Sequence, residues 1–159
     1  MIDVESYARS GDFCDFFLKE IDSLYQLAFL LTGSESQAEQ SLLAALEDCK
    51  RAKVFKPWLG SWTRLAVIER AMKTPSNGSA NTNIGSEPME RHAILQLEKM
   101  DRFVYVLSVL ESYSVRDCAI LLRLSKREIR EAQVRAMQTV TSFLARPLDT
   151  QQNAIALGA

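Results

Sequence analysis

The stretch YSVRDCAILLRLSKREIREAQVRAM, Tyr113–Met137, predicts two helices separated by a short turn. Ser114 can cap the first helix, with Asp117 three residues later. Ser125 can cap the second, where Glu128 completes an S-x-x-E capping box. A short helix, a tight turn and a longer basic helix are typical of a helix-turn-helix, whose second helix enters the major groove of DNA. This stretch therefore predicts a helix-turn-helix in the second half of the chain.

The second of these helices separates its apolar residues from most of its charges. An apolar stripe at steps of three and four is formed by Ile129, Ala132, Ala136, Val140 and Phe143. Cations that lie mostly off this stripe, and that we expect to contact DNA, are Lys126, Arg127, Arg130 and Arg135. Glu128 and Glu131 share the helix and would repel phosphate. The expected DNA-facing surface is thus mixed but net basic.

The first half of the chain also predicts helices. One stripe comprises Phe13, Phe17, Ile21, Leu24, Ala28 and Leu31, and a second comprises Ala38, Leu42, Ala45 and Cys49. Gly33 is a candidate C-cap between them, followed by Ser34 or Ser36 as N-cap. Pro57 can open a third helix from Trp58 to about Lys73. No segment alternates at period two for long enough to demand a strand, so we expect an all-α fold.

Between the two halves lies a segment rich in Ser, Asn, Gly and Pro, TPSNGSANTNIGSEP, which predicts a flexible linker. We expect a helical domain over 1–73, a linker over 74–89, a helix-turn-helix domain over 90–146 and a frayed tail over 147–159. The second domain would begin with a helix from Glu90 to Leu97. Asp101 would then cap a helix over RFVYVLSVL.

Charge is segregated along the 159 residues, although the net charge is only −1. Residues 1–49 hold two basic and ten acidic side chains, whereas residues 50–73 hold seven basic and one acidic. Residues 114–146 hold seven basic and three acidic side chains. Two separate basic segments are the electrostatic pattern of a nucleic-acid-binding protein, and a near-neutral total does not exclude it.

Other function classes receive little support from the sequence. No apolar run approaches the ~20 residues that span a bilayer, and the first residues lack the order of a signal peptide, so we expect a cytoplasmic protein. Cys14, Cys49 and Cys118 are scattered, which favours buried thiols over disulfides or zinc. His92, the single histidine, is interpreted as a surface residue. Without a phosphate loop, a metal cluster or a catalytic triad, we expect neither an enzyme nor a cofactor.

Three motifs in order resemble the extracytoplasmic-function sigma factors of bacteria. LYQLAFLLTGSESQAEQ (Leu24–Gln40) resembles their L-Y-x-x-A-x-x-x-T-G-x-x-x-x-A-E-D, and FKPWLGSWTRLAVIER (Phe55–Arg70) resembles F-x-x-W-L-x-x-I-A-R-N-x-A-I-D. YSVRDCAILLRLSKREI resembles their helix-turn-helix, Y-S-x-x-E-I-A-x-x-L-G-x-S. The resemblance covers roughly Phe13 to Leu144. It implies two helical domains that bind RNA polymerase core and promoter DNA.

The resemblance also implies roles for individual residues. The second helix would bind the beta-prime subunit of polymerase core through Glu39, Gln40, Leu43, Leu46 and Glu47. The third helix and the loop before it would hold and open the minus-ten element through Lys53, Lys56, Arg64, Arg70 and Lys73. The last helix would read the minus-thirty-five element. Trp58 and Trp62 could stack on bases, but at helical spacing we expect them in the core.

Several positions depart from the family pattern. Gln40, Leu43 and Leu65 replace polar or charged residues of the first domain. Arg123 stands where the family has Gly, in a turn that favours a left-handed backbone, and Glu128 replaces a Ser or Thr. These departures leave open an alternative, a sigma mimic that binds an anti-sigma factor or polymerase without reading promoters.

Overall fold

The computed structural model describes residues 4–75 and 88–146, and the described residues form an all-α protein. The chain divides into two compact units, Met1–Thr82 and Asn83–Ala159. The predicted tail and residues 76–87 of the predicted linker lie outside the described residues, so the linker stays a prediction. No helix in the described ranges is long and apolar enough to cross a membrane.

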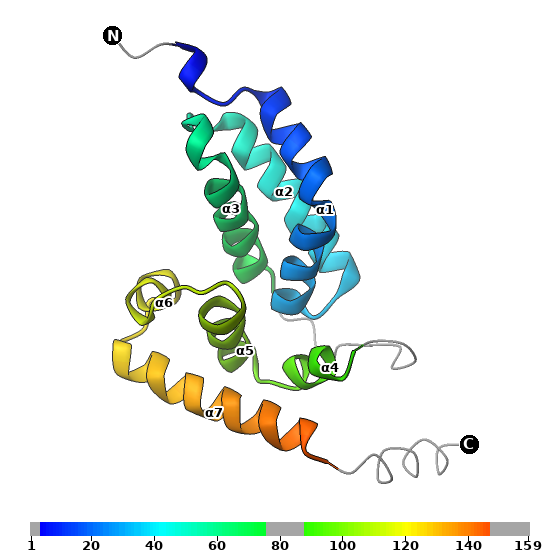
Figure 1. Ribbon diagram of the computed structural model, residues 1–159, viewed down its shortest axis with the longest axis vertical. Coiled ribbons are helices and arrows are strands. Elements are labelled where there is room, and N and C mark those ends of the chain that lie inside the picture. The colour runs from blue at the N-terminus through cyan, green and yellow to red at the C-terminus, as the bar shows by residue number, and fades with distance from the viewer. Residues whose placement is uncertain (1–3, 76–87, 147–159) are drawn as a thin grey trace, which may run out of the picture. The chain divides into compact units, whose positions relative to one another are not determined.

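The first unit is built on three helices that lie side by side (Figure 1). They are α1 (Ser10–Thr32), α2 (Glu35–Arg51) and α3 (Leu59–Lys73). A 3₁₀ turn, η2 (Lys56–Trp58), opens α3, and another, η1 (Val4–Ser6), precedes α1. Their shared core contains Phe13, Phe17, Leu24, Leu31, Ala38, Leu42, Ala45, Cys49, Val67, Ile68 and Ala71. The predicted apolar stripes therefore face this core, with one exception.

That exception is Ile21, whose side chain is 42% exposed although the stripe predicted it in the core. The prediction was wrong because Ile21 lies at the edge of the stripe, where the curved surface of the helix turns toward solvent. The predicted break between the first two helices is confirmed. Gly33 adopts φ 71°, and the Ser34 hydroxyl accepts a hydrogen bond from the Gln37 N–H. Of the two candidate caps, Ser34 is the one used.

The second unit packs four helices and one π-helical turn. These are α4 (Met89–Leu95), α5 (Lys99–Tyr105), the turn η3 (Val106–Leu110), α6 (Val115–Leu122) and α7 (Lys126–Leu144). The long helix α7 contacts α4, α5 and α6 (Figure 1). Its buried residues are Ile129, Ala132, Ala136 and Val140, which meet a core that includes Phe103, Val104, Leu107 and Cys118.

Both predicted caps of the helix-turn-helix are present. The Ser114 hydroxyl accepts a hydrogen bond from the Asp117 N–H at 3.1 Å, and the Ser125 hydroxyl accepts one from the Glu128 N–H at 3.2 Å. In return the Glu128 carboxylate accepts from the Ser125 N–H at 2.8 Å. These hydrogen bonds lower the pKa of Glu128, so the capping carboxylate stays charged. Local sequence alone placed these helix starts.

Asp101 is not the helix cap that the sequence predicted. α5 begins earlier, with Glu98 at its N-cap position, so that Asp101 lies inside the first turn. Its carboxylate accepts two hydrogen bonds from Arg135 on α7, one from Nη2 at 2.8 Å and one from Nε at 3.2 Å. The capping prediction failed because the Asp101 side chain is hydrogen-bonded to Arg135, which is 34 residues away in the chain.

Two non-glycine residues with positive φ flank α6. Arg123, which stands where the resembled family has Gly, adopts the left-handed conformation with φ 55° and ψ 43°, and Ser112 has φ 60°. Each conformation is strained for a residue with a Cβ atom. Because Cys118 is the one fully buried residue of α6, this short helix is weakly anchored between two strained turns.

The cysteines and the histidine occupy mostly enclosed positions. Cys49 and Cys118 are buried and Cys14 is half-buried, and all three are free thiols. Burial raises the pKa of the Cys49 thiol to about 11, which keeps it neutral and unreactive. His92 is half-buried with its Nε2 enclosed, so the interpretation as a surface residue was wrong.

Candidate nucleic-acid interface

The two arginines predicted to bind DNA from α3 both point toward neighbouring helices. Arg70 Nη2 donates to Asp48 Oδ1 on α2 at 2.6 Å, and its Nε donates to Oδ2 of the same carboxylate. The guanidinium lowers the pKa of Asp48. Arg64 Nη1 donates to the Ser23 hydroxyl on α1 at 3.0 Å. Arg70 thus forms a half-exposed ion pair with Asp48 on the neighbouring helix, and its role as a DNA contact stays a prediction.

The outward face of α3 is aromatic instead. Trp58 is 63% exposed and Trp62 is 44% exposed, so the expectation that they belong to the core was wrong. Leu59, Thr63 and Val67 occupy the core-facing positions, which turns the two tryptophans to solvent. The same outward face continues through Leu65, Glu69 and Met72.

Trp58 belongs to an aromatic cluster that also contains Tyr7 and Phe55. The Tyr7 and Phe55 ring centroids are 4.5 Å apart, and Phe55 meets Trp58 edge-on at 5.5 Å. Lys53 Nζ lies 4.6 Å from the centroid of the Tyr7 ring. Exposed rings can stack on nucleobases, and an adjacent ammonium can attract a phosphate. The aromatic cluster therefore has the chemistry of a site for unpaired bases.

Three predicted lysines of this region remain available. Lys53, Lys56 and Lys73 are exposed, and none forms an ion pair with a carboxylate in the part of the chain that the structure describes. Lys56 follows Phe55 directly, and Lys53 lies two residues before it. Positive charge is therefore retained beside the aromatic cluster, although Arg70 is paired.

The predicted DNA contacts of α7 fall into three groups. Lys126 and Arg130 are exposed and have no ion-pair partner among the described residues. Arg127 Nε lies 2.8 Å from Glu131, but its side chain is 86% exposed, and such surface pairs are weak. Arg135 is paired with Asp101, although its side chain is 57% exposed, and its role as a DNA contact stays a prediction. The available charge is thus concentrated in the first turn and a half of the helix.

The predicted polymerase-binding residues share the outer face of α2. Glu39, Gln40, Leu43 and Glu47 are exposed, and Leu46 is half-buried. Leu43 is 67% exposed, which is unusual for a leucine in the middle of a helix. An apolar side chain surrounded by carboxylates and an amide is suited to contact with a protein.

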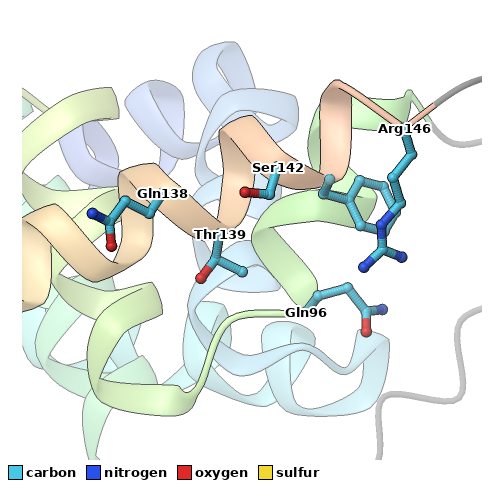
Figure 2. A pocket seen from close by; sticks show the side chains of 6 residues that line it. Gln96, Gln138, Thr139, Ser142 and Arg146 are labelled. Atoms are coloured by element: carbon cyan, nitrogen blue, oxygen red, sulfur yellow. The ribbon is translucent and has the colours of Figure 1, made fainter.

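A shallow pocket in the second unit is a weaker candidate site. It has a volume of about 340 Å³ and is lined by Gln96, Gln138, Thr139, Ser142, Phe143 and Arg146. Figure 2 shows three of these polar side chains projecting from α7, with Gln96 opposite and Arg146 at one end. Arg146 lies over the Phe143 ring at 5.5 Å. Because the polar residues around it are exposed, the pocket has no buried group that would select a ligand.

The sequence did not reveal the contribution of Tyr7 and Phe55, because the two rings are far apart in the chain and only the folded unit brings them together. No group of three or more His, Cys, Asp or Glu side chains in residues 4–75 and 88–146 is placed to hold a metal ion. A scan against protein-family models finds no match for the chain, and a search of curated proteins finds none either.

Proposed function

We propose that the protein is an extracytoplasmic-function type sigma factor, which binds RNA polymerase core and promoter DNA to direct transcription initiation. The observation that carries the proposal is the aromatic cluster with its exposed Trp58 and neighbouring lysines, at the position where the family resemblance implies contact with the minus-ten element. In this proposal the protein works in the cytoplasm, without a cofactor and without catalytic residues of its own.

The first unit would hold DNA that is already unpaired. Trp58 and Trp62 offer stacking surfaces, and stacking is worth about 1–3 kcal/mol per base. Lys53 and Lys56 would attract the flanking phosphates, while Arg70 would support the fold. This distribution favours single-stranded over duplex DNA, because rings are reached only by bases that have left the stack.

The second unit would bind duplex DNA through α7. Lys126 and Arg130 lie at the end of the helix where the dipole also attracts phosphate. The Glu128 carboxylate accepts a hydrogen bond from the Ser125 N–H and so caps the helix. It still adds a negative charge to the surface that would face phosphate. We therefore expect modest, mainly electrostatic duplex affinity that falls steeply with salt.

The outer face of α2 would bind polymerase. Leu43 would provide apolar contact, and Glu39 and Glu47 would pair with basic residues of the beta-prime subunit. Protein interfaces bury a few apolar anchors within a polar rim, and this face has that composition.

The proposal is tested by titrating labelled DNA with the Trp58→Ala variant. We expect single-strand affinity to fall roughly 5- to 150-fold, corresponding to the loss of one stacking contact, and duplex affinity to remain within about twofold. Trp58→Phe should retain most of the single-strand affinity. Leu18→Ala is a matched control, because Leu18 is an exposed apolar residue, 75% exposed, on a different helix. Equal affinities for all four proteins would contradict a stacking role for Trp58.

A second candidate function is a sigma mimic that binds an anti-sigma factor or polymerase without promoter recognition. The pairing of Arg70 and Arg135 with internal carboxylates favours it, as does the exposed Leu43. Anisotropy with promoter-like duplex at low salt separates the two, since a sigma factor should bind more tightly than ~1 μM, the tight end of the ~10⁻⁴–10⁻⁶ M range of non-specific contacts. In transcription with purified core enzyme, only a sigma factor should yield promoter-specific transcripts.

A further inference from the structure

The segment before α1 pairs with the loop before α3. The Ala8 N–H donates to the Val54 carbonyl oxygen at 2.7 Å, and Tyr7 and Phe55 form an isolated antiparallel bridge. Two parts of the chain that are distant in sequence are thereby joined at the backbone.

Side chains extend this contact toward the proposed DNA site. The centroid of the Tyr7 ring lies 4.5 Å from that of Phe55 and 4.6 Å from the ammonium of Lys53. Phe55 in turn meets Trp58 edge-on. One ring, half-buried itself, thus contacts both the cation and the aromatic residue that supports the exposed tryptophan.

The loop has few other anchors. Val54 is its buried residue, at 3% exposure, whereas Lys53, Lys56, Pro57 and Trp58 are exposed. The backbone hydrogen bond from the Trp58 N–H to the Phe55 carbonyl closes only the last turn of the loop. We therefore expect the orientation of Phe55, and through it that of Trp58, to depend on the Tyr7 ring that packs against Phe55.

We infer that residues 4–8 are an integral part of a single-strand DNA site and that Tyr7 is its positioning residue. The Tyr7 ring fixes Lys53 and Phe55 so that Trp58 is held ready for an unpaired base and Lys53 for the adjacent phosphate. Pre-organised contacts bind more tightly, because less side-chain freedom is lost on binding. This inference rests on the proposed function, but the positioning itself can be measured without DNA.

The experiment uses the full chain with Trp62→Phe, so that Trp58 is the sole tryptophan. Tyr7→Phe, Tyr7→Leu and Tyr7→Ala are compared in this background. The first readout is acrylamide quenching of Trp58 fluorescence without DNA. The second is the affinity for a ten-nucleotide oligo-dT at low salt. Far-UV circular dichroism and thermal unfolding identify any variant that fails to fold.

We expect Tyr7→Phe to match the parent protein in both readouts, because the ring is retained. Tyr7→Leu keeps apolar bulk but loses the ring. It should raise the quenching constant and weaken oligo-dT binding about 5- to 10-fold, part of one stacking contact. Tyr7→Ala should raise the quenching constant and weaken oligo-dT binding more than Tyr7→Leu does. Duplex affinity, which we assign to α7, should not change in any of them.

Two results would overturn the inference. One is Trp58 quenching and oligo-dT affinity that are the same in Tyr7→Leu as in the parent. The other is a loss of affinity in Tyr7→Phe equal to that in Tyr7→Leu, which would assign the effect to the hydroxyl. If the parent does not bind oligo-dT but quenching still depends on the ring, the proposed function fails while the positioning of Trp58 by Tyr7 is supported.

Discussion

The two basic segments of the molecule use their cations differently. Before and along α3, the lysines stay exposed while Arg70 is paired across to α2, and the outward surface is formed by tryptophans. At the start of α7, Lys126 and Arg130 are open to solvent, and Arg135, further along, is paired with α5. Lys53, Lys56 and Lys73 of the first segment and Lys126 and Arg130 of the second are available, whereas Arg70 and Arg135 are paired with carboxylates of neighbouring helices. The first unit thus offers rings and charge, the second charge alone.

A physical reason accounts for the pair between Arg135 and Asp101. Asp101 is buried, with a side chain only 13% exposed, and a carboxylate in that position needs a charged donor. The planar guanidinium of Arg135 supplies two parallel hydrogen bonds, which lysine could not. Counting basic residues therefore overstates the charge available to DNA.

The largest expected effect distinguishes the unpaired Arg130 from the paired Arg135 on α7, in duplex affinity and in melting temperature. Arg130→Ala should weaken binding to duplex DNA about 3- to 10-fold and reduce the slope of log K against log salt by about 0.9, the value for one phosphate contact. Arg135→Ala should leave the salt slope unchanged but lower the melting temperature by several degrees, because Asp101 loses its partner. Anisotropy titrations at several salt concentrations and thermal unfolding measure the two effects.

The Arg130 prediction would be contradicted by an unchanged slope, and the assignment of Arg135 to the fold by an unchanged melting temperature. Arg51→Ala is the matched control, since Arg51 is an exposed arginine at the end of α2, away from α7 in sequence and in the other unit.

The next largest effect is on the free energy of unfolding, when residues at positive φ in the turns of the two units are replaced. At the break after α1 the left-handed residue is Gly33, whereas both turns around α6 place residues with a Cβ atom at positive φ. Arg123→Gly and Ser112→Gly should each raise the free energy of unfolding by up to about 1 kcal/mol, through relief of this strain. Gly33→Ala should lower it by about the same amount.

Urea denaturation of the full chain, compared through the midpoint at unchanged m-value, measures these shifts. A lower midpoint for Arg123→Gly would mean that the gain in unfolded-state freedom exceeds the strain relieved, and would refute the view of α6 as strained at both ends.

The smallest expected effect is the pH dependence of the stability that the Asp48–Arg70 ion pair contributes between α2 and α3. The hydrogen bonds from Arg70 lower the pKa of Asp48 in the folded state below the unfolded value of about 3.9. A lowered carboxyl pKa stabilises the fold above the unfolded value, and this stabilisation is lost as pH falls through the folded value. Both side chains are more than a third exposed, so solvent screening keeps the contribution small.

Asp48→Asn should therefore have a lower urea midpoint than the parent at pH 6, and the gap should narrow as pH falls from 4 to 3. A gap that stays constant over that range would show that the pair contributes nothing through the charge of Asp48.

The all-α class and most helix boundaries, apart from the start of α5, followed from the sequence because their signals are local. Ser125 and Glu128 lie within one turn of each other, as do Gly33 and Ser34, and hydrogen bonds to neighbouring backbone groups decide such positions. The left-handed Arg123 was likewise predictable from its place in the turn. Errors arose at Ile21, Trp58 and Trp62, where a period of three to four residues shows that a stripe exists but not which edge of it is covered.

The sequence by itself thus determined which segments are helical, where most of them begin, and that positive charge lies in two of them. Only the tertiary structure decided which charges and rings are exposed, because that depends on side chains far apart in the chain. Arg70 meets a carboxylate 22 residues away, Arg135 one 34 residues away, and Tyr7 meets the loop before α3. Tertiary packing selects these partners. The residues next to either side chain in the sequence do not indicate which partner it contacts.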